Sequence, residues 1–345
     1  MRVLLVADIV GGVRTFTREL VRELDRREIE VHLALIGGGS PDEFPGAASC
    51  EVRDLRLEWM PQPWEDVKDT SAWVATLRDR HRPDVIHMNT FAPLDDPDVP
   101  VLLTVHSCVL TWWRAVLGRD APPSWSRYRN LVRRALARAD TIVVPTRAFG
   151  RELGLVYGDE FQTCAIPNGR AVGEGDDVAA REPLVVTVGR LWDKAKNSGL
   201  LIDAAASIEG RVVLIGPERD DGAAPPALLA ERDVLAYLRR AAVFAEPARY
   251  EPFGLAALEA ALCGCALVLG DIPTLREVWG DAALFVSPDD PEALIDAVNG
   301  LLRDPLRRSR VALRARERAQ RYPPAAMAEM YASAYEQLVD TGVAA

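Results

Sequence analysis

The residues best suited to chemistry lie in one stretch, residues 251–259, which reads E-P-F-G-L-A-A-L-E. An apolar run ending in polar residues precedes it, and a helix end, a glycine turn and a second apolar run follow it. This pattern predicts strand, turn, helix and strand of a parallel sheet. The turn would present the backbone N–H groups of Phe253, Gly254 and Leu255 at a helix N-terminus, where they suit a phosphate. A Cβ at Gly254 would keep the backbone away from such a ligand.

Two carboxylates bracket these predicted donors. Glu251 precedes the helix, and Glu259 lies one and a half turns into it at about 3.6 residues per turn. A carboxylate does not bind phosphate, so we expect the pair to accept hydrogen bonds from hydroxyl groups on either side of one. A phosphate flanked by hydroxyl-rich groups is a nucleotide sugar. The alternative is an ordinary Rossmann-like turn with two solvated carboxylates.

A second charged segment, residues 189–197 (G-R-L-W-D-K-A-K-N), follows an apolar run at 184–188 and precedes a helix that we expect to reach about Ser207. Arginine and lysine at a strand end and helix start suit a second anion. The alternative is that these charges are simply solvated.

In the first half of the chain, two strand ends carry candidate residues. A strand at residues 3–7 leads through Gly11-Gly12 into a helix that we expect to end near Arg26; the turn is not G-x-G-x-x-G, so a dinucleotide fingerprint is unsupported. His106 follows the expected strand 99–105, and the carboxyl ends of parallel strands are where open α/β sheets bind ligands. A lone histidine is more often a satisfied core or surface residue.

Trp112, Trp113 and Arg114 follow His106 closely. Aromatic faces suit the C–H faces of sugars. If these residues are functional, they line an acceptor site; alternatively they pack a lid or a helix pair.

The length and pattern of the chain predict two α/β domains, because 345 residues are enough for two cores. We expect the first domain over residues 1–169, a linker rich in Gly, Asp, Glu and Ala over 170–183, the second domain over 183–322, and a final helix at about 325–345. Further strands are expected at 31–36, 84–88, 141–144, 211–215, 243–250 and 282–286, and helices near 71–80, 126–139 and 229–241, with Thr146 as a helix N-cap.

Composition excludes several classes of protein. The net charge of −10 argues against a nucleic-acid partner. No apolar run approaches the ~18 residues of a membrane span, so we expect a cytoplasmic protein. The five cysteines are scattered, and Cys263-Gly-Cys265 lacks partners at zinc spacing. Eight arginines between residues 303 and 321 favour a solvated helix face over membrane docking, since aromatic anchors are lacking. Asp96-Pro97-Asp98 is interpreted as a turn, and no metal site is expected.

The E-x7-E pattern, with P-F-G inside it and E-A-x-x-C-G-C-A-L-V from Glu259 onward, resembles the signature of retaining family 4 glycosyltransferases of the GT-B fold. The resemblance implies two Rossmann-like domains facing each other across a central cleft, with the C-terminal helix crossing back to the first domain. It also implies sugar transfer from a nucleoside-diphosphate sugar to a hydroxyl acceptor, by front-face departure and attack, with no cofactor.

The resemblance also assigns roles. Arg190 and Lys196 would hold the leaving diphosphate, with Lys194 the competing choice for the lysine. Gly11 and Gly12 would face the donor phosphates from the opposite domain. The sugar would be contacted by His106 and Glu251, and the ribose by Glu259.

The chain departs from the family between Gly216 and Val243. A typical member has a helix, a strand and a helix there, whereas we expect a loop at 218–226 and one helix. That unit usually borders the nucleobase, so the base is undetermined. Two alternatives stay open: a retaining phosphorylase of the same fold that uses inorganic phosphate, and a nucleotide-sugar-binding protein without turnover.

Overall fold

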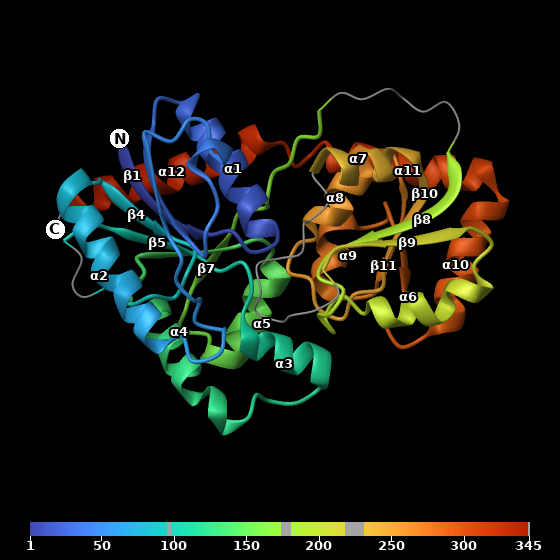
Figure 1. The fold of residues 1–345 in the computed structure, drawn as a ribbon, viewed down its shortest axis with the longest axis horizontal. Helices are drawn as coiled ribbons and strands as arrows, with labels where there is room; N and C mark the ends of the chain where they lie inside the picture. The colour runs from blue at the N-terminus through green and yellow to red at the C-terminus, as the bar shows by residue number, and fades with distance from the viewer. Residues whose placement is uncertain (95–97, 174–180, 218–230, 344–345) are drawn as a thin grey trace. The chain divides into compact units, whose positions relative to one another are not determined.

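The computed structural model describes residues 1–94, 98–173, 181–217 and 231–343 (Figure 1). The chain forms two compact units. The first comprises Met1–Arg114, Gly118–Gly169 and Pro324–Ala345, and the second comprises Ala115–Leu117 and Arg170–Pro323. Each unit is built on its own parallel sheet.

The first unit holds a seven-stranded parallel sheet in the order β3-β2-β1-β4-β5-β6-β7. Its central strands are almost wholly buried, because helices cover both faces of a parallel sheet. The strands are β1 (Arg2–Asp8), β2 (Glu30–Ile36), β3 (Ser49–Arg53), β4 (Val85–Met88), β5 (Val101–Thr104), β6 (Thr141–Val144) and β7 (Thr163–Ala165). The helices are α1 (Gly12–Asp25), α2 (Trp64–His81), α3 (Val109–Leu117), α4 (Ser126–Arg138), α5 (Arg147–Tyr157) and α12 (Pro324–Val343).

The strand order of the first unit reverses between β1 and β4. The chain builds β2 and β3 on one side of β1 and then crosses to the other side for β4. Open α/β sheets bind ligands at the carboxyl ends of the strands at such a switch point. The loops after β1, β4 and β5 therefore occupy the position where a ligand site is expected.

The C-terminal helix α12 is part of the first unit, where it packs against α1 and β4 (Figure 1). Two of its side chains, Tyr331 and Tyr335, are fully buried. The Tyr335 hydroxyl lies 2.7 Å from His87 Nδ1 of β4, and the Tyr331 hydroxyl lies 3.1 Å from Thr104 Oγ1 of β5. Two buried tyrosines with polar partners anchor this helix to the sheet.

The second unit holds a five-stranded parallel sheet in the order β12-β11-β10-β8-β9, whose switch point lies between β8 and β10. Its strands are β8 (Glu182–Val188), β9 (Arg211–Ile215), β10 (Ala241–Glu246), β11 (Ala266–Gly270) and β12 (Leu284–Val286). Its helices within the described residues are α6 (Ser198–Ala204), α7 (Glu231–Arg240), α8 (Leu255–Leu262), α9 (Pro273–Trp279), α10 (Pro291–Arg303) and α11 (Pro305–Ala319). The two charged segments singled out from the sequence thus follow the two strands that flank the switch point.

Several predicted elements need correction. The strands β3 and β7 were not predicted; they form the two edges of the first sheet, where half-exposed strands need no apolar run. Helix α2 begins at Trp64, before the predicted residue 71. The strand predicted to reach residue 250 ends at Glu246, because Pro247 follows it. The loop predicted at 218–226 and Asp96 of the D-x-D turn lie outside the described residues.

Candidate active site

A partly buried lysine joins the two charged segments of the second unit. Lys196 lies in the loop after β8, and its Nζ donates to Glu246 Oε1 at 2.6 Å and to Glu251 Oε2. Asn197 ties the same loop down, because its side-chain amide donates to the carbonyl oxygens of Pro247 (2.9 Å) and Pro288 (2.8 Å). Both carboxylates belong to the neighbouring segment, Glu246 as the last residue of β10 and Glu251 five residues later. The lysine is thereby fixed at the switch point.

The charges of this cluster do not balance if both carboxylates are ionised. Burial raises the pKa of Glu246 to about 7, although Lys196 opposes the shift. Burial also acts to raise the pKa of Glu251, but Lys196 and two backbone N–H groups outweigh it and lower that pKa. Glu246 Oε2 is buried and has no hydrogen-bond partner among the described residues. Glu251 is therefore the ionised partner of Lys196, and Glu246 gains or loses its proton near neutral pH.

The predicted phosphate donors are partly engaged by Glu251 itself. Its Oε1 accepts hydrogen bonds from Gly254 N at 2.8 Å and Phe253 N at 3.4 Å. Gly254 is the N-cap of α8 with φ of 91°, and a Cβ there would lie 3.1 Å from Leu275 Cδ2, so the position requires glycine. Leu255 is the first residue of α8. A ligand at these N–H groups would have to share them with Glu251 or displace it.

Glu259 lies on α8 and is bound by Arg170, which was not predicted from the sequence as a site residue. Arg170 Nε donates to Glu259 Oε1 at 2.7 Å, and the same guanidinium donates to Glu231 of α7. The Arg170 side chain is 2% exposed and that of Glu259 is 15% exposed. Arg170 begins the segment interpreted as a linker, where only its position directly after Pro-Asn-Gly could have drawn attention to it.

Arg190 lies in the loop after β8, near Lys196 in sequence, but it makes different contacts. Its guanidinium donates to Asp193 Oδ2 at 2.9 Å and lies 5.6 Å from the ring centre of Trp192. Its side chain remains 38% exposed, so it can contact a ligand. Lys194 is exposed, whereas Lys196 contacts Glu251. This geometry favours Lys196 over Lys194 as the lysine of the site.

The first unit holds the remaining predicted residues. Gly11, with φ of 58°, is the N-cap of α1, and Gly12 begins that helix; both are exposed. His106 follows β5, and its ring meets the ring of Phe16 edge-on at 4.4 Å. Burial lowers the pKa of His106 to about 3, so the imidazole is neutral at physiological pH. His106 Nε2 is buried, and no residue that the structure describes forms a hydrogen bond with it.

The aromatic pair lies on α3. Trp112 and Trp113 meet edge-on with ring centres 6.1 Å apart, and both are partly exposed. The guanidinium of Arg119 covers Trp113 at 5.3 Å, and Arg114 donates to the carbonyl oxygen of Leu155 at 2.7 Å. These contacts are compatible with an acceptor surface and with packing alone.

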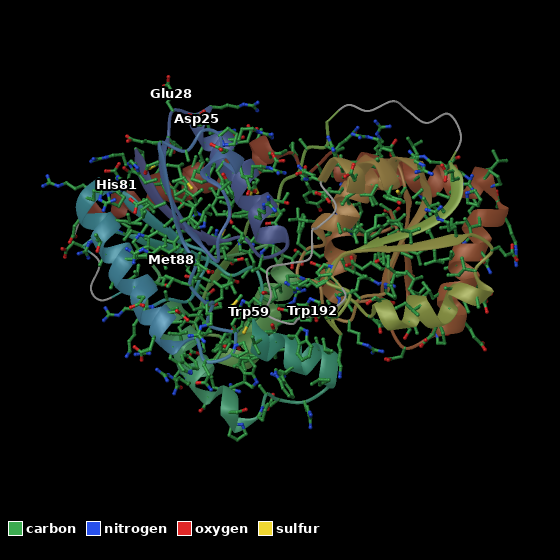
Figure 2. The ribbon with its side chains drawn as sticks, viewed as in Figure 1. Asp25, Glu28, Trp59, His81, Met88 and Trp192 are labelled. Carbon is green, nitrogen blue, oxygen red and sulfur yellow. The ribbon has the colours of Figure 1, made fainter. Side chains whose placement is uncertain are left out.

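Polar residues that sequence reasoning missed lie at the switch point of the first sheet. Glu58, in the loop after β3, is 8% exposed, and Thr90, two residues after β4, is 3% exposed. Figure 2 labels Trp59, the residue after Glu58, and Met88, the last residue of β4. Burial raises the pKa of Glu58 to about 7, and the nearby carboxylate of Asp8 adds to the shift. A single glutamate in an irregular loop carries no sequence pattern that could have identified it.

No three His, Cys, Asp or Glu side chains of the described residues gather in a group that could hold a metal ion. None of the described helices has the length and apolar character needed to cross a membrane.

Comparisons with known proteins agree with this architecture. The sequence model of the family Glycosyltransferase Family 4 matches residues 10–172, and the sequence model of the family Glycosyl transferases group 1 matches residues 182–304. A D-inositol 3-phosphate glycosyltransferase of Mycobacterium avium is 30% identical over 86% of this chain and 81% of its own length. The glycogen synthase of Mycobacterium tuberculosis is 28% identical over 92% of this chain and 90% of its own length.

Solved structures share the fold. Sucrose-phosphate synthase from Thermosynechococcus elongatus superposes with a TM-score of 0.82 at 20% identity, covering 99% of this chain and 100% of that one. Anabaena HepE in complex with UDP-glucose gives a TM-score of 0.72 at 18% identity, covering 98% of this chain and 100% of that one. The fold is therefore GT-B, as predicted. The chain belongs to the family 4 glycosyltransferases and is a glycosyltransferase enzyme.

Proposed function

We propose that this glycosyltransferase moves a sugar from a nucleoside-diphosphate sugar to a hydroxyl group and retains the anomeric configuration. The observation that carries the proposal is Lys196, fixed at the switch point of the second sheet between Glu246 and Glu251. HepE, which shares the fold, holds UDP-glucose. The names of the curated relatives describe sugar transfer to an inositol phosphate and glycogen synthesis.

In the proposed reaction, the second unit stabilises the leaving group. Lys196 and Arg190 would offset the negative charge that grows on the diphosphate as the bond to the sugar breaks. The N-terminus of α8 would add the dipole of its free N–H groups. Because the diphosphate can itself accept the proton of the attacking hydroxyl, this mechanism requires no separate protein base and no covalent intermediate.

The two glutamates of the signature would bind different parts of the donor. Glu251 already accepts backbone hydrogen bonds through one carboxylate oxygen and contacts Lys196 through the other. A sugar hydroxyl would therefore donate to a carboxylate whose position is already fixed by hydrogen bonds. Glu259 would accept ribose hydroxyls while Arg170 holds its carboxylate in place. His106 would face the transferred sugar as a neutral hydrogen-bonding group, since its pKa of about 3 excludes an acid role at neutral pH.

A panel of nucleotide sugars tests the proposal and both alternatives. We expect release of nucleoside diphosphate that depends on an acceptor, and NMR should show a product with the anomeric configuration of the donor. A phosphorylase would instead consume inorganic phosphate and form sugar 1-phosphate. A binding protein would raise its melting temperature with a donor but release nothing. Either of these outcomes, or an inverted product, would overturn the proposal.

A further inference from the structure

Within the part of the chain that the structure describes, the switch point of the first sheet holds buried polar atoms without hydrogen-bond partners. They include Oγ1 of Thr90, a residue that is 3% exposed, and Nε2 of His106 after β5. The buried amide of Asn89, directly after β4, forms no hydrogen bond of ordinary geometry there, although it lies near enough to the ring of His87 to raise the pKa of that imidazole. Buried polar atoms in folded proteins nearly always form hydrogen bonds. A group of buried polar atoms without partners, at the edge of a sheet where ligands bind, therefore indicates that these atoms bind a ligand.

A buried carboxyl group lies beside these atoms. Glu58 is 8% exposed and faces the backbone N–H of Phe91, the residue after Thr90. The carboxylate of Asp8, at the end of β1, lies close enough to raise the pKa of Glu58 further. The loop after β3 thereby brings Glu58 to the ends of β1 and β4. Among the described residues, no lysine or arginine forms a salt bridge with it.

The chemistry of this group defines what it can bind. A threonine hydroxyl, a carboxamide, an imidazole and a carboxyl group together offer both donors and acceptors, which matches hydroxyl groups that also do both. A phosphate needs cations or several free N–H groups. Next to Glu58 and Asp8 it would instead meet two carboxyl groups, and placing like charges together in a desolvated site is costly.

We propose that Glu58, Asn89 and Thr90 bind the hydroxyl groups of a neutral polyol acceptor and reject an acceptor that carries a phosphate near its reactive hydroxyl. This inference rests on the proposed function, because it assigns the acceptor of the same reaction. Glu58 is a specificity residue in this account: it selects by its charge and by its hydrogen bonds, and it takes no part in cleaving the donor. Protonated Glu58 both donates and accepts a hydrogen bond, and ionised Glu58 repels an anion.

Matched pairs of acceptors test the proposal. The probes are myo-inositol against myo-inositol 1-phosphate and D-glucose against D-glucose 6-phosphate, assayed with whichever nucleotide sugar the panel identifies. We expect kcat/KM to favour the neutral member of each pair by about tenfold or more, and raising the pH from 7 to 9, where a phosphate monoester is already almost fully ionised, should widen the ratio as Glu58 ionises. Equal use of the phosphorylated members, or a preference for them, would overturn the proposal.

Variants separate Glu58 from its surroundings. Glu58→Gln should lower the ratio of kcat/KM for neutral over phosphorylated acceptor and remove the pH dependence of that ratio. Thr90→Val should raise the KM of the neutral acceptor and leave donor affinity unchanged. Glu65→Gln removes a carboxylate that is 78% exposed on α2, so it should behave as the wild type. If Glu58→Gln does not fold, the proposal is still tested by two measurements. These are the ratio of kcat/KM for neutral over phosphorylated acceptor in the wild type, and the KM of the neutral acceptor in Thr90→Val. A ratio unchanged in a folded Glu58→Gln protein contradicts the proposal.

A binding measurement distinguishes this inference from the proposed function. Trp59 adjoins Glu58, so binding of a neutral polyol should change the tryptophan fluorescence of the wild type and leave that of a Trp59→Phe protein unchanged. Donor binding and slow donor hydrolysis without any response to polyols would overturn the acceptor assignment alone. A fluorescence response to polyols in a protein that binds no nucleotide sugar would overturn the proposed function alone.

Discussion

In the second unit, the cations at the carboxyl edge of the sheet are bound to carboxylates: Lys196 to Glu246 and Glu251, and Arg170 to Glu259. In the first unit, the comparable edge has a carboxyl group at Glu58 that pairs with no cation among the described residues, and a neutral imidazole at His106 whose Nε2 has no hydrogen-bond partner among them. One edge is organised by ion pairs and the other by burial of polar groups. Under the two proposals, the carboxyl edge of one parallel sheet would bind an anion and that of the other a neutral ligand, although both sheets have a switch point in their strand order.

The largest expected effect is the loss of the cation in the second unit. Lys196→Ala should lower kcat/KM by about 10²–10³-fold, because it removes a charge that stabilises the leaving group in a desolvated site. Lys194→Ala is the matched control, since that side chain is exposed and should leave the rate unchanged. Steady-state kinetics with both variants decide between them, and equal losses would contradict the assignment of Lys196.

A smaller effect separates the two glutamates of the signature. Glu259→Gln should weaken nucleoside diphosphate binding by about 1.5–3 kcal/mol, because a charge-assisted hydrogen bond to ribose is lost. Glu251→Gln should lower kcat and leave that affinity nearly intact. Arg170→Met should weaken the diphosphate as Glu259→Gln does, and the double variant should add little, since the two side chains are ion-paired.

Calorimetry measures the affinity of free nucleoside diphosphate for the wild type and for the four variants, which are Glu259→Gln, Glu251→Gln, Arg170→Met and the double variant. Diphosphate binding unchanged in Glu259→Gln would exclude the ribose contact. Full additivity of the two changes would show that Arg170 does not act through Glu259.

The comparison also shows what could be predicted from the sequence. The Glu251–Glu259 turn and its strands were predicted because glycine, helix and apolar run occur together in a short segment. The contacts of Lys196 with both Glu246 and Glu251 were not predicted, since they join residues 50 and 55 positions apart through the sheet. Arg170 and Glu58 were missed for the same reason. A single charged residue in a loop acquires its role only when folding buries it beside a partner.

A further prediction uses the pH dependence of stability. Burial raises the pKa of Glu58 from its usual 4.5 to about 7, so between these values the folded state binds more protons than the unfolded state. The free energy of unfolding should therefore fall as pH rises from about 4.5 to about 7, by at most about 3 kcal/mol from this residue. Glu58→Gln should flatten that fall, as measured by denaturant unfolding at pH 5 and pH 8. An unchanged slope would mean that Glu58 is not buried in solution.

Glu246 provides the counterpart in the second unit. Its pKa is also raised to about 7, but it contacts Lys196, so its ionisation adds negative charge where the diphosphate would bind. Diphosphate affinity should therefore weaken as pH rises above about 7 in the wild type. Glu246→Gln should remove that loss, whereas Glu58→Gln should keep it. If Glu58→Gln removes it instead, the two edges do not differ as described.

The smallest effect is expected from removing divalent cations. In the proposed reaction, Lys196 and Arg190 would release their carboxylate partners in part and offset the diphosphate charge, and the N-terminus of α8 would add to them, so no magnesium ion would be needed for that charge. Activity should thus survive an excess of EDTA, measured as nucleoside diphosphate release before and after dialysis. Complete loss of activity that Mg²⁺ or Mn²⁺ restores would show that these side chains do not suffice. The comparison would then have to be redrawn, because the edge organised by ion pairs would still lack the charge needed to hold its anion.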